Sequence, residues 1–211
     1  MRNILYAIFF ALMTTSCNQK FTAEESATIH AGEREIMYVL SVTESPDSTI
    51  LRQKSLPISE QMVQSEDFTL LRRRMLATVQ DPENEGVGIA APQVGISRQM
   101  VAVQRFDKEG EPFEFFINPE IVERIGEKKA GGEGCLSVPE IRGDVERWQT
   151  IRLRYRDEQF VEHEELIEGF TAVIFQHELD HLDGHIYTEK AEKMLTPEEL
   201  EELMAAQEED E

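Results

Sequence analysis

Cationic side chains are scarce in this chain. Lys and Arg number 21 against 42 Asp and Glu, which gives a formal net charge of −21 and a pI near 4.6. Because binding to nucleic-acid phosphates or to anionic lipid needs clustered Lys and Arg, the composition argues against both as general partners. The acidity bears on solubility rather than on fold.

Cysteine and long hydrophobic runs are equally scarce. The apolar run over residues 4–13 is too short for a membrane-spanning helix, which needs about 20 residues. Preceded by Arg2 and followed by small residues and Cys17, this run is typical of a secretory signal peptide of the lipoprotein type. We expect residues 1–17 to be that signal, with Cys17 lipidated; plain secretion and a misassigned start are the alternatives. The only other thiol is then Cys135, so no intramolecular disulfide can form.

Internal repeats are absent, and no low-complexity run precedes the acidic C-terminus. We expect a tether over 18–44, a folded domain over 45–194, and an acidic helix and tail over 195–211. Period-2 alternation and apolar runs predict strands at 99–103, 113–119, 120–122, 150–155 and 159–166. Turn residues predict a turn at 45–47 and a loop over 126–132, and short extended pieces are expected at 49–52 and 56–58.

Helical spacing and capping residues predict three helices. The first covers 66–79 after Ser65 as N-cap, the second runs from 168–169 to about His181 with Gly184 beyond its end, and the third covers 196–206. The expected fold class is therefore α+β, with short antiparallel strands around a central helix and a further helix at the C-terminus.

The central helix carries the motif His-Glu-x-x-His at residues 177–181. Positions i and i+4 share one helix face, so His177 and His181 can direct two imidazole nitrogens at one metal ion. Glu178 is placed to take a proton from a water molecule at that metal. Two ligands do not complete a site, and a third must come from elsewhere in the chain.

Cys135 is the strongest candidate for the third ligand, because thiolate and imidazole together suit a divalent transition metal. A buried structural cysteine is the alternative, since the spacing to His177 matches no known metal motif. The Gly-x-Gly pair at 86–88 lacks the third glycine of a dinucleotide fingerprint. Gln93, a polar residue among apolar neighbours, needs hydrogen-bond partners if buried.

Three motifs occur in order, at 86–93 (GVGIAAPQ), 133–137 (EGCLS) and 176–181 (QHELDH). Together they resemble peptide deformylase, a metallohydrolase that removes the formyl group from N-formyl-methionyl peptides. The resemblance implies a metal held by Cys135, His177 and His181, with Glu178 as general base and acid. Ferrous iron is the family's usual metal, with zinc, nickel or cobalt as substitutes.

The same resemblance implies roles for further residues. Gln93 and the backbone N–H of Leu136 would stabilise the oxyanion. Asp180 would orient a ligand histidine, and Glu133 would pair with Arg147 to brace the cysteine loop. The methionine pocket and peptide contacts are expected from the following residues: Phe170, Val173, Ile174, Val87, Gly88 and Arg142. Gly131 stands where the family often has an apolar side chain, which predicts a wider pocket.

Two other functions are open at this stage. One is a metallopeptidase of different specificity, although no third ligand follows His181 in a metzincin pattern. The other is a catalytically idle, deformylase-like lipoprotein, although every catalytic position is filled. A lipoprotein would face the periplasm from the cell or outer membrane, whereas deformylation of nascent chains takes place in the cytoplasm, which is the alternative location. The sequence indicates no oligomeric state.

Overall fold

The backbone of this fold is one antiparallel sheet wrapped around a helix. The structure, a computed structural model, describes residues 20–84, 86–196 and 199. Its six strands are β1 (Gly88–Ala90), β2 (Met100–Gln104), β3 (Phe113–Cys135), β4 (Val138–Arg156), β5 (Glu162–Glu168) and β6 (Lys193–Leu195). The sheet order is β1-β2-β3-β4-β5, and β6 pairs with β4. The antiparallel α+β architecture predicted from the sequence is confirmed.

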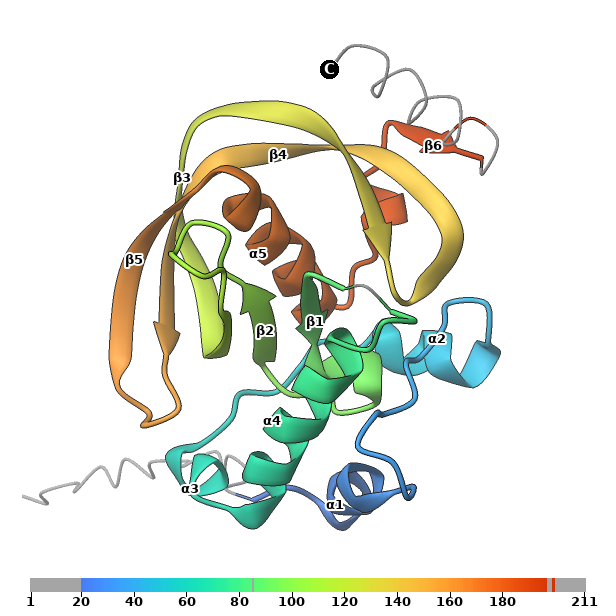
Figure 1. The fold of residues 1–211 in the computed structure, drawn as a ribbon, viewed down its shortest axis with the longest axis vertical. Coiled ribbons are helices and arrows are strands. Elements are labelled where there is room, and N and C mark those ends of the chain that lie inside the picture. The colour runs from blue at the N-terminus through green and yellow to red at the C-terminus, as the bar shows by residue number, and fades with distance from the viewer. Residues whose placement is uncertain (1–19, 85, 197–198, 200–211) are drawn as a thin grey trace, which may run out of the picture.

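Five α-helices and two short 3-10 helices accompany the sheet in the described part of the chain. They are α1 (Ala23–His30), α2 (Ser45–Leu51), α3 (Glu60–Val63), α4 (Glu66–Val79), η1 (Ala91–Val94), α5 (Gly169–Leu182) and η2 (Tyr187–Glu189). Figure 1 shows α5 in the hollow of the curved sheet, with the β3–β4 hairpin arching beside it and α1, α3 and α4 gathered at one end. The central helix predicted from the motif is therefore the helix that the sheet encloses.

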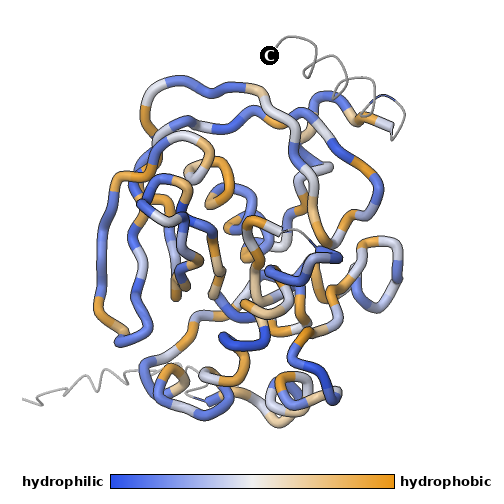
Figure 2. Tube along the Cα trace, viewed as in Figure 1, coloured by the Kyte–Doolittle hydropathy of each residue, from blue (hydrophilic) through white to orange (hydrophobic). Residues whose placement is uncertain are grey.

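The apolar face of α5 holds it against the sheet. Ala172 and Phe175 are fully buried, and the Phe175 ring meets the Phe116 ring of β3 edge-on at 4.6 Å. Edge-to-face aromatic pairs add to the free energy gained from burial alone. Figure 2 shows hydrophobic segments gathered around the centre of the fold and mainly hydrophilic residues along the outer hairpin. This packing gives the two motif histidines a rigid base.

The long hairpin differs from the prediction of separate strands and a loop over 126–132. The chain continues as strand through that segment, where Lys128 pairs with Trp148 and Gly131 with Val145. The segment is polar on both faces and contains three glycines, so it lacks the period-2 signal of a half-buried strand. Backbone pairing with β4 decides its conformation, and several register shifts bend it around α5.

Residues 45–51 also differ from the prediction. The expected turn and extended piece form α2 instead, with Pro46 in its first turn. Proline is well tolerated there because the first N–H groups of a helix have no intrahelical partner. The predicted helix over 66–79 is confirmed as α4, with the Ser65 hydroxyl accepting a hydrogen bond from the Phe68 N–H.

The part of the expected tether that the structure describes is packed onto the domain. Ile29 of α1 is fully buried, and the Met37 N–H donates to the hydroxyl of Thr78 on α4. The guanidinium of buried Arg74 donates to the carbonyls of Ile29 and Glu35. Residues 20–44 are therefore a structural part of the fold, because they cover apolar surface and satisfy a buried charge.

Two predictions fall on residues that are not described. The signal segment 1–17 lies wholly outside the described residues, and the helix over 196–206 lies outside them apart from 196 and 199. None of the helices in the described ranges is long and apolar enough to cross a membrane.

Candidate metal centre and active site

Three side chains from two distant segments converge beside α5. His177 and His181 lie one turn apart on the helix, and Cys135 is the last residue of β3. The ligand atoms of these three residues lie within 4.8 Å of one another, and the Cys135 Sγ is 3.2 Å from the His181 Nε2. Such a Cys/His/His group is a donor set that divalent transition metals accept, with a further position open for water.

The protonation of this group fits metal binding. Burial opposes ionisation of Cys135, but His181 and His177 beside it outweigh that effect and hold the pKa of the thiol well below its usual value. Burial likewise disfavours charged His177, yet hydrogen bonds to Cys135 and Glu133 raise the pKa of its imidazole. Metal ligation uses the thiolate and neutral imidazoles, so binding would release the histidine proton. The residues present therefore fit a divalent metal ion.

Glu178 points into the same site from the next position on α5. It is 4% exposed, and burial raises the pKa of its carboxyl to about 7. Its Oε2 is buried and accepts no hydrogen bond from the described residues. A carboxylate with a pKa near neutrality, free to accept a proton, is suited to general-base catalysis.

Gly88 of β1 explains why Glu178 can occupy this place. A Cβ added at Gly88 would lie 2.5 Å from Glu178 Oε1 and 2.9 Å from Ile174 Cγ2. Only glycine allows the strand to approach the helix so closely. The glycine predicted to lie beside a substrate therefore also makes room for Glu178.

Gln93 of η1 turns its amide toward the cysteine. Its Oε1 accepts a hydrogen bond from the Ala90 N–H at 2.8 Å, which fixes the orientation of the amide. Its Nε2 then lies 3.6 Å from Cys135 Sγ and 3.3 Å from the hydroxyl of Ser137. Leu136 and Ser137 form the turn between β3 and β4 next to the cysteine. An N–H donor beside the cluster of ligands is thus available to an oxyanion.

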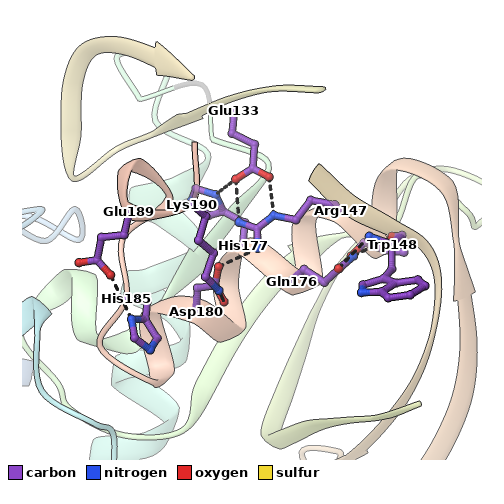
Figure 3. A network of polar contacts seen from close by, with 10 residues as sticks. Glu133, Arg147, Trp148, Gln176, His177, Asp180, His185, Glu189 and Lys190 are labelled. Atoms are coloured by element: carbon purple, nitrogen blue, oxygen red, sulfur yellow. Dashed lines mark hydrogen bonds and ion pairs between the residues drawn. The ribbon is translucent and has the colours of Figure 1, made fainter. Parts of the chain in front are cut away.

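A network of ion pairs supports His177 from behind (Figure 3). Glu133 Oε2 lies 2.8 Å from His177 Nδ1, which leaves Nε2 of that ring for the metal. Arg147 donates to both oxygens of Glu133 and, through Nη1, to Asp180 at 2.7 Å. The hydrogen bonds from Arg147 and His177 outweigh burial and lower the pKa of Glu133 to about 2. The carboxylate is thereby kept ionised as an acceptor for the His177 imidazole.

The expected substrate residues lie around this centre in different environments. Ile174 is buried against Gly88, Val173 is partly buried, and Phe170 is 56% exposed with its ring 5.3 Å from that of Phe106. Arg142 is exposed on β4, where its side chain passes beside Gly134. Val87 accepts a hydrogen bond from the Gln104 N–H just before β1.

Sequence reasoning missed three residues that the structure places at the site. Ser137 is buried against Gln93, the ring of Tyr187 stacks on His177, and Lys190 pairs with Asp180. Ser137 is the last residue of the cysteine motif, which is a usable signal. Tyr187 and Lys190 carry none, because their positions depend on how the chain turns back after α5.

A family model described as polypeptide deformylase matches residues 39–196. The chain belongs to this family. A peptide deformylase of Leptospira biflexa is 43% identical over 148 residues, which cover 67% of this chain and 82% of that protein.

Solved structures of the family have the same fold. A class I type b peptide deformylase from Acinetobacter baumannii with bound Met-Ala-Ser is similar at a TM-score of 0.65 and 37% identity, over 74% of this chain and 98% of that one. The actinonin-bound form of the same protein matches at a TM-score of 0.65 and 38% identity, covering 74% and 97%. The described α1 region, residues 20–38, precedes the part matched by the family model.

Proposed function

We propose that this protein is a metal-dependent peptide deformylase that hydrolyses the formamide bond of N-formyl-methionyl peptides. The observation that carries the proposal is the convergence of Cys135, His177 and His181 with the Glu178 carboxylate and the Gln93 amide. Membership of the deformylase family supports the same conclusion. The Met-Ala-Ser peptide bound by the Acinetobacter baumannii relative supports a peptide substrate.

In the proposed reaction, Cys135, His177 and His181 would hold one divalent metal, which would supply Lewis acidity and make a water molecule easier to deprotonate. Glu178 accepts the proton of the attacking water and returns it to the leaving amine. The Gln93 amide and the Leu136 N–H would donate to the oxyanion that forms at the formyl oxygen when the formyl carbon is attacked. Ferrous iron is the metal we expect, with zinc, nickel and cobalt as substitutes; metal analysis after anaerobic purification tests this.

The proposed peptide site lies along β1. This strand is at the end of the sheet order, and no described strand pairs with its edge away from β2, so that edge could pair with an extended peptide through Val87 and Gly88. Phe170, Val173 and Ile174 would form the wall around the methionine side chain, and Arg142 would contact the peptide further along. Gly131 has no atom within 4 Å of an added Cβ, which is compatible with a wide pocket.

Two variants test the mechanism with formyl-Met-Ala-Ser as substrate and metal content measured in parallel. Glu178→Ala removes the general base and is expected to lower kcat by about 10²–10⁴-fold with metal retained. Cys135→Ala is expected to lose metal and activity together. Glu164→Ala, on the exposed face of β5, is the control and keeps both. Deformylation that survives both site substitutions would refute the proposal, and cleavage of acetyl-Met-Ala-Ser would favour a different hydrolase.

We also propose, from the sequence pattern of residues 2–17, that Cys17 carries a lipid that holds the protein to a membrane facing the periplasm. Residues 18 and 19 alone separate Cys17 from the described chain, so the domain would sit within about 10 Å of its anchor. Fatty-acid labelling of the wild type, with Cys17→Ala as control, tests the anchor. Equal labelling of the two, or none, would refute the lipid anchor at Cys17.

A further inference from the structure

The chain that follows α5 turns back and contacts that helix at two places. The first contact is Tyr187 in η2, whose ring stacks on the His177 imidazole with centroids 5.8 Å apart. The Tyr187 hydroxyl donates to the Ile141 carbonyl at 2.7 Å, which ties η2 to β4. These two contacts fix the position of the next residues, including Lys190.

The second contact is made by Lys190. Its Nζ lies 2.5 Å from Asp180 Oδ1, and the other oxygen of Asp180 accepts a hydrogen bond from Arg147. Arg147 in turn holds Glu133, which is bonded to His177 Nδ1. Figure 3 shows this unbroken series, which runs from the surface to the ligand histidine.

The outer end of the series is exposed and its middle is buried. The Lys190 side chain is 40% exposed, whereas that of Arg147 is 5% exposed. The outer part of the series borders a cavity of about 400 Å³ between α5 and the β3–β4 hairpin, which none of the three ligand residues lines. Lys190 can therefore be replaced without opening the hydrophobic core.

Lys190 balances the charges of the series. Arg147 is shared by two carboxylates, those of Glu133 and Asp180. With Lys190 present, two cations face two anions. Without it, Asp180 depends on Arg147 alone and competes with Glu133 for the guanidinium. A weaker hold on Glu133 frees the His177 ring to turn, because hydrogen bonds behind a ligand histidine orient it.

We propose that Lys190 is a positioning residue for the metal ligand His177, acting through Asp180, Arg147 and Glu133. The inference rests on the proposed metal centre but not on the proposed substrate. It assigns to the segment after α5 a part in retaining the metal. An exposed lysine pair by itself contributes little, so the effect depends on the buried series to which this lysine is joined.

The test measures metal retention rather than turnover. Full-length protein is loaded with Co²⁺, its visible absorption spectrum is recorded, and the rate of cobalt transfer to a chelator is followed. Lys190→Met is expected to speed cobalt loss about tenfold and to alter the spectrum, since loss of a partner behind a ligand costs about 10- to 100-fold in metal affinity. Lys190→Arg, which keeps the charge, is expected to restore slow release.

Lys54→Met is the matched control. Lys54 also pairs with an aspartate at the end of α5, Asp183, at 3.0 Å, but no hydrogen bond joins that pair to His177 in the described structure. Wild-type release and spectrum from Lys190→Met, or equal acceleration by Lys54→Met, would overturn the proposal, as would a wild type that binds no cobalt. Formyl-Met-Ala-Ser hydrolysis is assayed separately, so a failed deformylase assay with lysine-dependent cobalt release refutes only the proposed function.

Discussion

Replacement of Gly88 by alanine tests the close approach between β1 and α5. The new methyl carbon would lie 2.5 Å from Glu178 Oε1 and 2.9 Å from both Glu178 Cδ and Ile174 Cγ2. Ordinary contacts begin near 3.4 Å, so the carboxylate must move by about 1 Å. A displacement of that size at a catalytic group costs about 10²-fold in rate. Overpacking of this kind also costs roughly 1–3 kcal/mol of folding stability.

The assay compares kcat/KM on formyl-Met-Ala-Ser, metal content and urea unfolding for Gly88→Ala. Gly132→Ala on β3 is the control, because no atom lies within 4 Å of its added Cβ. We expect Gly88→Ala to keep its metal and to lose about 10²-fold in kcat/KM, with Gly132→Ala near the wild type. A Gly88→Ala protein with wild-type kcat/KM would show that Glu178 either does not sit where it is placed or is not the base.

Three further predictions concern the core and the oxyanion donor. Arg74→Met leaves the carbonyl of Ile29 without its charged donor and is expected to lower the free energy of unfolding by about 3 kcal/mol in urea titrations; a change below about 1 kcal/mol would contradict it. Burial opposes ionisation of Glu25, but Arg98 outweighs it and lowers the pKa of this carboxyl. The stability that Glu25 supplies is therefore complete above its usual pKa of 4.5 and is lost as pH falls through its lower pKa in the folded protein. The free energy of unfolding of Glu25→Gln should differ from that of the wild type at pH 7, and the two values should converge in acid. Gln93→Ala should lower kcat by about 10²–10³-fold with metal retained, and a loss below tenfold would argue against its role as oxyanion donor.

Patterns within a few residues of one another were enough to predict several features of the fold and the site. The four-residue spacing of His177 and His181 sets both on one helix face, whatever surrounds the helix. Ser65 caps α4 and Gly184 adopts a positive φ after α5, because each of these features depends on the backbone within a few residues. The three motifs, in their order along the chain, likewise indicate the family that the family model matches.

Long-range contacts decided what local patterns did not. The segment over 126–132 is a strand because β4 pairs with it. Residues 20–44 are held by Arg74, by the apolar surface of α4 and by backbone hydrogen bonds such as that from Leu40 to Gln93. Chain segments with little amphipathic pattern of their own take the conformation that satisfies their backbone groups in the folded protein.

The division between sequence and structure is clearest at the metal centre. The sequence by itself determined the helix with two histidines, the glutamate between them, and a cysteine suited to complete the ligands. Only the tertiary structure placed Cys135 Sγ 3.2 Å from His181, oriented the Gln93 amide by its hydrogen bond to Ala90, and paired Lys190 with Asp180. The physical reason is distance along the chain: spacing within one helix is set by its own hydrogen bonds, whereas contacts between distant segments depend on the packing of the whole sheet around α5.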